Sequence, residues 1–294
     1  MKPKSTPYLL TFPTWLVMGI FFAIPIAIML WISFQQRSMY GGIKPVPDYS
    51  NYFLTGQFVQ NYVRSFEWIY LQILARSFWI AAATTVLCLV MSYPVAYYIA
   101  LKANARLKDI LLVLVVIPFW TSFLIRTYAW MFILRNEGFL NTFLMNLGII
   151  QNPLPLLYNQ FAVMIGLVYG EIPFMVLPIY ASLEKLDRSL LDAASDLGAS
   201  RASAFWRITV PMSFAGILAG CILVFIPSLG QFIVPDLLGG AKDMLVGNLV
   251  QNQFSVARNK PFGSAIAFEL TAIVLVLLFF YARYVKRKGE ESLL

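Results

Sequence analysis

Six long apolar segments constrain the fold of this chain more than any other feature of its sequence. A helix that crosses a bilayer needs about 20 mostly apolar residues. The hydrocarbon core offers no water to the backbone, so segments of this length satisfy their N–H and C=O groups as helices. We therefore expect an all-α membrane protein with six transmembrane helices, at residues 9–34, 77–101, 110–134, 161–183, 212–238 and 262–285.

The composition agrees with a membrane protein. Only 12% of the 294 residues are charged, against about 25% in ordinary soluble domains, and the mean hydropathy is +0.72. The chain has no histidine, which removes the commonest general base and metal ligand. Cys88 and Cys221 both lie in apolar runs, where neither a disulfide framework nor a zinc site is expected.

The basic residues predict the orientation. Lys and Arg concentrate in the short segments that follow even-numbered spans, at 102–108 and 286–288, and Lys2 and Lys4 precede the first span. Short cytoplasmic loops carry such an excess, so both termini are expected in the cytoplasm, and the net charge of +8 needs no nucleic-acid partner. The first apolar run is too long for a cleaved signal peptide and is interpreted as a retained span.

The outer loops are expected at about 35–76, 135–160 and 239–261. They are long and hold most of the Asn, Gln, Gly and loop Pro residues. They are either docking surfaces for an external partner or simple solvated connectors.

The inner loop between the fourth and fifth spans, residues 184–211, has the pattern of two short helices. Ser189 with Asp192 has the form of a capping box, and Asp187 is an alternative cap. Gly198 stands where a helix ends in a left-handed residue. A second short helix carries Phe205, Trp206 and Ile208, and the apolar stripe of the first consists of Leu190, Leu191, Ala194 and Leu197.

Two interpretations of this hairpin remain open. It rests on lipid as an interfacial helix pair, or it docks into a groove of a cytoplasmic protein. The small, flat surface of Ala193 and Ala194 beside Gly198 favours the groove.

The spacing within the loop resembles a known motif. Binding-protein-dependent ABC importer permeases carry an EAA loop of pattern Glu-Ala-Ala, three residues, Gly, nine residues, Ile, one residue, Leu-Pro. Here Asp192 replaces the Glu and Val210 replaces the Leu, and both changes keep the chemistry. The matching residues, which the resemblance implies contact the ATPase subunits, are Asp192, Ala193, Ala194, Gly198, Ile208 and Pro211.

Longer stretches are similar to the spermidine/putrescine permeases of the PotB/PotH type, at 117–126, 166–169, 172–180, 196–199 and 226–240. The resemblance implies the MetI-like permease fold and one transmembrane domain over 1–294. Within it, the core covers about 70–285, helix 9–34 is an added span and 184–211 is the coupling loop. It also implies a bacterial inner-membrane complex with a second permease, two ATPase subunits and an external polyamine-binding protein.

Acidic residues lie deep in the predicted spans. Glu171 is at the middle of the fourth, Glu269 is in the outer third of the sixth, and Asp236 is near the outer end of the fifth. Arg76 and Arg126 are close to outer ends, where snorkelling accounts for them. Ionisable residues in spans are costly and usually functional. The acids indicate either a path for a cation or protonated carboxyls that bond neighbouring helices.

Aromatic faces attract cations and tolerate methylene spacers. Trp120, Tyr128, Tyr169 and Tyr180 therefore lie in segments that could line a path with Glu171, although residues of this kind also face lipid or core. Gly216 and Gly220 form a small-xxx-small pair in the fifth span, which predicts close helix packing, with the second permease as a possible partner.

The sequence lacks a phosphate-binding loop and the residues of a Ser-His-Asp set. We therefore expect no enzyme activity and no cofactor in this chain, with ATP and Mg²⁺ bound by a partner. The leading prediction is half of the path of an ATP-driven polyamine importer. The alternatives are an importer permease for another small cationic or amino-acid-like solute, and a proton-coupled secondary transporter that uses Glu171.

Overall fold

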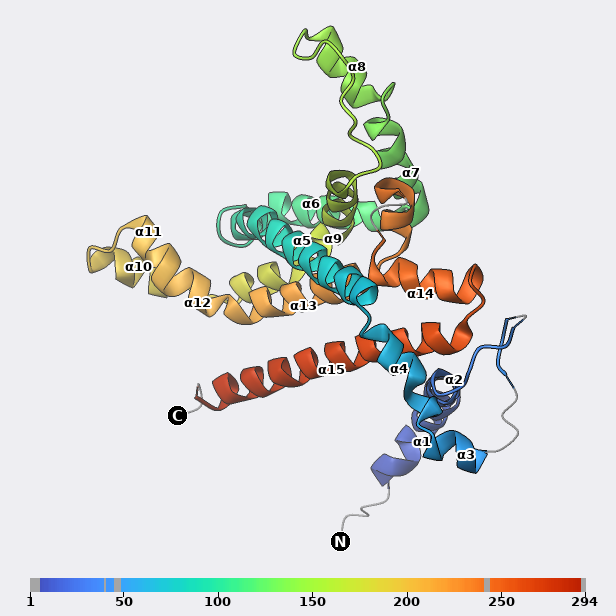
Figure 1. The fold of residues 1–294 in the computed structure, drawn as a ribbon. Coiled ribbons are helices and arrows are strands. Elements are labelled where there is room, and N and C mark those ends of the chain that lie inside the picture. Colours follow the sequence, from blue (N-terminus) through green and yellow to red (C-terminus); the bar gives the residue numbers. More distant parts are fainter. Residues whose placement is uncertain (1–5, 40, 45–48, 241–243, 292–294) are drawn as a thin grey trace. The chain divides into compact units, whose positions relative to one another are not determined.

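The computed structural model describes residues 6–39, 41–44, 49–240 and 244–291. These residues are almost entirely helical (Figure 1). Among the described residues, the β-pairing found is one isolated bridge between Arg37 and Ile43. The predicted all-α class is confirmed. Lys2 and Lys4, used above to predict the orientation, lie outside the described residues.

The chain divides into two compact units. The first contains residues 1–72 and 249–294, and the second contains residues 73–248. The prediction of one permease domain over 1–294 stays a prediction.

The first unit is built around the N-terminal and C-terminal spans. Its helices are α1 (Thr6–Met18), η1 (Gly19–Ala23, a π-helical turn), α2 (Ile24–Ser33), α3 (Tyr49–Leu54), η2 (Gln57–Val59), α4 (Gln60–Ser65) and α15 (Lys260–Glu291).

Helix α15 packs against α2 and α4. The amide nitrogen of Asn61 donates to the carbonyl oxygens of Ser33 and Gln35, both at 2.8 Å. These bonds tie the end of α2 to α4, because a helix end leaves its last carbonyls without partners in the helix. On the other side of α4, the Ser65 hydroxyl donates to the carboxylate of Glu269 on α15.

The second unit contains the remaining helices. Two of them cross its boundary, since α5 begins in the first unit and α14 ends in it. The remaining helices are α5 (Trp68–Leu101), α6 (Ala105–Val116), η3 (Ile117–Trp120), α7 (Phe123–Leu134), α8 (Phe139–Asn146), α9 (Gln160–Glu184), α10 (Ser189–Asp196), α11 (Arg201–Ala204), η4 (Phe205–Thr209), α12 (Val210–Met212), α13 (Phe214–Gly230), η5 (Pro235–Gly239) and α14 (Val246–Ser255).

Helix α9 is the centre of this unit. It contributes to two clusters of buried residues. In the first, Met175, Val176 and Ile179 pack with residues of α5 and α13. In the second, Val163 and Leu167 pack with residues of α5, α7 and η5. A helix that is apolar on most of its circumference is buried on most sides, and α9 is the clearest example in the described part of this chain.

The number of spans depends on how two bent segments are treated. Four helices are long and apolar enough to cross a membrane: Thr11–Ser33, Trp68–Leu101, Gln160–Glu184 and Lys260–Arg283. Two further pairs, Ala105–Trp120 with Phe123–Asn146 and Arg201–Met212 with Phe214–Gly230, bend by 91° and 63°. The predicted six spans are obtained when each bent pair counts as one.

Both bends have local causes. Thr121 and Ser122 adopt extended backbone angles (ψ of 145° and 136°), which end the helix before α7 begins. At the second bend, the Ser213 hydroxyl donates to the carbonyl oxygens of Thr209 and Val210 at 2.8 and 3.1 Å. Such back-bonding by serine bends helices. The third span, expected at 110–134, is bent at Thr121 and Ser122. The fifth span, expected at 212–238, is wrong at its outer end, because α13 ends at Gly230 and Gln231 adopts extended backbone angles.

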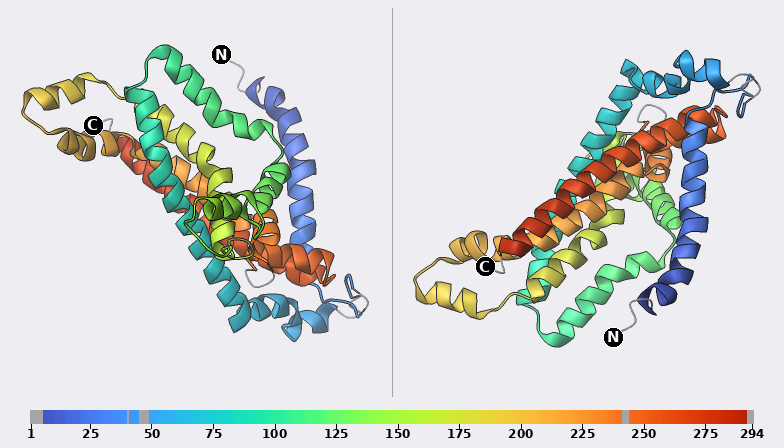
Figure 2. Two further views of the ribbon diagram at one scale, coloured as in Figure 1. Left: turned by 90° about the horizontal axis from the view of Figure 1, so that it is seen from above. Right: turned by 90° about the horizontal axis from the view of Figure 1, so that it is seen from below.

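The glycine pair of the fifth span packs inside this chain. A Cβ at Gly216 would lie 2.5 Å from the carbonyl oxygen of Pro178, and one at Gly220 would lie 2.7 Å from the Met175 sulfur. Both neighbours belong to α9, which lies beside α13 in both views of Figure 2. The suggestion that this pair faces a second permease is wrong.

This contact yields a stability prediction. Gly216→Ala should lower the melting temperature of the purified protein, since overpacking costs about 1–3 kcal/mol, more than the roughly 1 kcal/mol that alanine gains over glycine in a helix. Gly230→Ala is the matched control, because a Cβ there meets nothing within 4 Å. Equal melting temperatures for the two variants would contradict the close contact.

Candidate functional site

The 184–211 hairpin projects beyond the other helices of the second unit, as the yellow segment in both views of Figure 2 shows. Its first helix, α10, starts differently from the predicted capping box. Arg188 is already helical and Ser189 makes no cap, whereas the Asp187 carboxylate accepts the backbone N–H of Ser189 at 3.0 Å. This bond lowers the pKa of Asp187, because it favours the charged form. The capping box is wrong, and the alternative cap Asp187 is confirmed.

Gly198 ends α10 in the predicted left-handed conformation, with φ of +79°. The backbone N–H of Ala199 donates to the carbonyl of Ala194, and that of Gly198 donates to the carbonyl of Ser195, both at 2.9 Å. This pair of bonds is the Schellman motif, which favours glycine because an L side chain at positive φ is strained.

The residues of the predicted coupling motif gather on one end of the unit. Asp192, Ala193 and Gly198 are exposed, and a Cβ at Gly198 would meet nothing within 4 Å. The apolar side chains of Leu190 and Leu197 are 43% and 89% exposed. An apolar stripe that its own unit leaves uncovered fits docking to another molecule. The remaining motif residues, Ala194 and Ile208 (half-buried) and Pro211 (exposed), lie at or near its base.

The base of the hairpin is bonded to α5. Arg188 donates to the carbonyl oxygen of Ala100 at 3.3 Å, one of the carbonyls that the end of α5 leaves free. Nearby, the hydroxyls of Tyr93 and Ser213 are 3.0 Å apart, and Phe205 packs edge-on against Tyr93. The hairpin is therefore anchored to a span at its base while its tip is free.

Glu171 is the deep acid that the sequence placed in the fourth span. It is 5% exposed, and its Oε2 has no hydrogen-bond partner in the structure. The charge of Arg126 on α7 acts on it electrostatically, although the two form no ion pair. The buried Nε and Nη1 of Arg126 also lack partners.

Arg126 is half-buried, and its side chain packs among aromatic rings. Its guanidinium lies 5.8 and 5.7 Å from the ring centres of Phe119 and Phe123. Phe119 packs edge-on against Phe174 of α9 at 4.8 Å, which holds this basic group next to the helix of Glu171. The sequence signal was the aromatic residue three positions before Arg126, since residues at that spacing share a helix face.

The candidate path aromatics are separated. Tyr169 packs edge-on against Trp130 of α7 at 5.5 Å and lies two residues from Glu171. Trp120 is 79% exposed at the end of η3, and Tyr128 is 44% exposed on α7. Only Tyr169 has a described aromatic partner among these three.

The other two acids have different surroundings. Asp236 is exposed in the first turn of η5, where a carboxylate complements the helix dipole. Glu269 lies in the first unit and accepts the Ser65 bond described above, so that bond joins α15 to α4. Among the described residues, no three His, Cys, Asp or Glu side chains gather as a metal site.

Residues 92–289 match the family model described as binding-protein-dependent transport system inner membrane component. This chain belongs to that family. It is therefore a permease component of such a transport system and a multi-pass inner-membrane protein, and the EAA-like loop falls inside the matched range.

Two relatives extend the match over almost the whole chain. The spermidine/putrescine transport system permease protein PotB of Haemophilus influenzae is 42% identical over 92% of this chain and 90% of its own length. The PotB protein of Escherichia coli is 40% identical over 94% and 95%. The resemblance to PotB-type permeases is confirmed.

The fold is shared with solved importers. A bacterial ABC transporter involved in the import of the acidic polysaccharide alginate aligns with a TM-score of 0.72, at 15% identity, over 96% of this chain and 95% of the transporter chain. The predicted MetI-like permease fold is confirmed by this family and fold match.

The buried charges yield a double-mutant prediction. Removing Arg126 or Glu171 alone leaves the other charge buried without its counterpart, which is strongly destabilising. Arg126→Met with Glu171→Gln should therefore destabilise the protein less than the two single changes added together, by about 0.5–3 kcal/mol. The measurement is thermal unfolding of the purified protein.

The control pair is Arg135→Met with Glu171→Gln, whose effects should add. Additive effects at Arg126 would show that its charge does not act on Glu171.

Proposed function

We propose that this chain forms one half of the translocation path of an ATP-driven importer for polyamines, spermidine or putrescine. The observation that carries the proposal is the identity of 40–42% over more than nine-tenths of the chain with two spermidine/putrescine permeases. The second half of the path is a homologous permease, and an external polyamine-binding protein delivers the cargo to the outer face.

The energy enters through the 184–211 hairpin. We place this hairpin and both termini in the cytoplasm, where the exposed stripe of Leu190 and Leu197 fits a groove on an ATPase subunit. Two such subunits bind ATP and Mg²⁺, one for each permease. Movement of the docked hairpin reaches the spans at its base, through the contact of Arg188 with the end of α5.

The cargo interacts with Glu171 and the aromatic side chains near it. A polyamine presents ammonium groups separated by methylenes, which suits a path that offers both a carboxylate, Glu171, and an aromatic ring, Tyr169, on different faces of α9. Arg126 offsets part of the charge of Glu171. A path must bind its cargo weakly enough to release it, and a partly compensated carboxylate meets that need better than an isolated one.

The two other candidate functions explain less. A permease for another small cationic or amino-acid-like solute shares every feature except the named cargo of the relatives. A proton-coupled secondary transporter that uses Glu171 leaves both the exposed hairpin and the membership in a binding-protein-dependent family without a role.

Replacement of Gly198 tests the coupling role. Gly198→Val forces a β-branched residue to positive φ, at a cost of about 1–2 kcal/mol, and adds bulk to the docking surface. We expect loss of ATPase subunits from the purified complex and about tenfold lower ATP-driven uptake in proteoliposomes.

Gly148→Val is the matched control for this test. Gly148 also has positive φ, at +69°, and open surroundings, but it lies outside the hairpin. The control should keep its ATPase subunits. Normal uptake and normal ATPase retention in Gly198→Val would remove the coupling role from the hairpin.

Replacement of Glu171 tests the cargo. Glu171→Gln keeps the shape but removes the negative charge, and a hydrogen bond to a charged group contributes about 1.5–3 kcal/mol. We expect the apparent affinity for spermidine to fall about tenfold or more in uptake assays. The control is Glu137→Gln, which changes an exposed acid of the loop after α7.

If uptake of spermidine and putrescine is unaltered by Glu171→Gln, Glu171 is structural. If neutral solutes compete as well as polyamines, the cargo assignment is wrong.

A further inference from the structure

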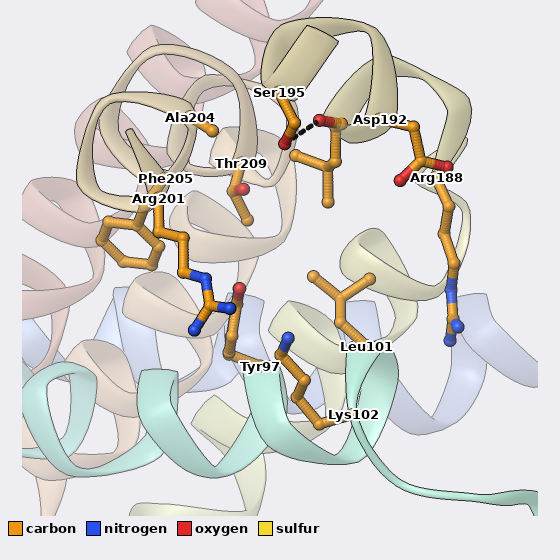
Figure 3. Close-up of a pocket in the computed structure, with 11 residues that line it drawn as sticks. Tyr97, Leu101, Lys102, Arg188, Asp192, Ser195, Arg201, Ala204, Phe205 and Thr209 are labelled. Carbon is orange, nitrogen blue, oxygen red and sulfur yellow. Dashed lines mark hydrogen bonds between the residues drawn. The ribbon is translucent and has the colours of Figure 1, made fainter. Parts of the chain in front are cut away.

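A cavity of about 370 Å³ lies between the C-terminal end of α5 and the hairpin (Figure 3). Its lining includes three basic residues, Lys102, Arg188 and Arg201, and one acidic residue, Asp192. Asp192 belongs to the coupling motif, but neither that motif nor the proposed cargo path includes the three basic residues.

Two of the three basic groups have no anionic partner. Among the residues that the structure describes, neither Lys102 nor Arg201 forms an ion pair with a carboxylate. The ion pair found there joins Lys108 to Glu184. Figure 3 shows the Lys102 amino group and the Arg201 guanidinium directed into the same space, with the Tyr97 hydroxyl beside them. Arg188 is engaged differently, with the carbonyl of Ala100.

The donors suit a particular class of ligand. Ammonium and guanidinium groups donate hydrogen bonds and accept none, and a phenol hydroxyl also donates. Like charges that converge on one cavity repel each other unless an anion lies between them. A phosphate group offers several acceptor oxygens and negative charge, and Arg and Lys are the residues that bind it most often.

We propose that this cavity binds a phosphate-bearing anion through Lys102, Arg201 and Tyr97. Because α5 is a span that ends at Leu101, the cavity lies where a span meets the aqueous phase. Both a phospholipid headgroup and a soluble phosphate compound have access there. The bound group bridges α5, which carries Tyr97, to α11, which carries Arg201, and therefore restrains the hairpin.

The inference goes beyond the proposed function, since it depends on the hairpin and not on the cargo. The test measures hydrogen–deuterium exchange of residues 188–209 in the intact permease complex, without ATP or polyamine. The complex is held in nanodiscs of phosphatidylcholine alone, in the same nanodiscs with inorganic phosphate, and in nanodiscs that contain phosphatidylglycerol. A failure of polyamine transport leaves this readout unaffected.

We expect hydrogen–deuterium exchange in the hairpin to slow about tenfold with one of the two anions. A tenfold change corresponds to the free energy of about one charge-assisted hydrogen bond. Slowing by phosphatidylglycerol alone identifies a lipid headgroup, and slowing by inorganic phosphate identifies a soluble ligand. The double variant Lys102→Gln, Arg201→Gln should lose the effect.

Two controls keep the outcome decisive. Arg207→Gln removes an exposed basic residue of the same hairpin that does not line the cavity, and should retain the slowing. Lys102→Arg with Arg201→Lys keeps both charges and should retain most of it. No slowing by either anion, or equal slowing in the Gln double variant, would overturn the proposal.

Discussion

The contact between α9 and α13 is the constraint on which the second unit depends. Two helices approach this closely only where one of them lacks side chains, and Gly216 and Gly220 provide that surface. Helix α9 carries Glu171 at its middle and leads into the hairpin at its end. The position of the buried charge and the position of the hairpin are therefore both set by the packing of one helix.

The locations of the spans could be predicted from sequence, but their shapes could not. Hydropathy measures how apolar a segment is, and it located the four helices of spanning length and the two bent pairs. The break at Thr121 and Ser122 is a matter of backbone angles, which the apolar run around it conceals. Pro118 precedes this break, whereas Pro173 and Pro178 lie within an unbroken α9, so proline alone does not distinguish the two cases.

Features of the hairpin that depend on one residue could be predicted from the sequence, whereas those that depend on distant residues could not. The left-handed turn at Gly198 depends on one residue, and the sequence predicted it correctly. The cap depended on where α10 begins, and a shift of two residues moved that role from Ser189 to Asp187. The hydrogen bond of Arg188 to Ala100 and the electrostatic action of Arg126 on Glu171 connect residues distant in sequence. No local pattern encodes such pairs, so these were missed.

The two groups of unsatisfied charge in the second unit differ in depth, and that difference separates their functions. Arg126 and Glu171 have opposite signs, Arg126 half-buried and Glu171 buried, so each lowers the cost of burying the other. Lys102 and Arg201 have the same sign and lie at the end of a span, where water and ions can reach them. The deep pair combines opposite charges and needs no resident ligand. The shallow pair is not neutral. Among the described residues, Asp192 is the acid that lines the same cavity, and the anion proposed above would lie between the hairpin and the end of α5.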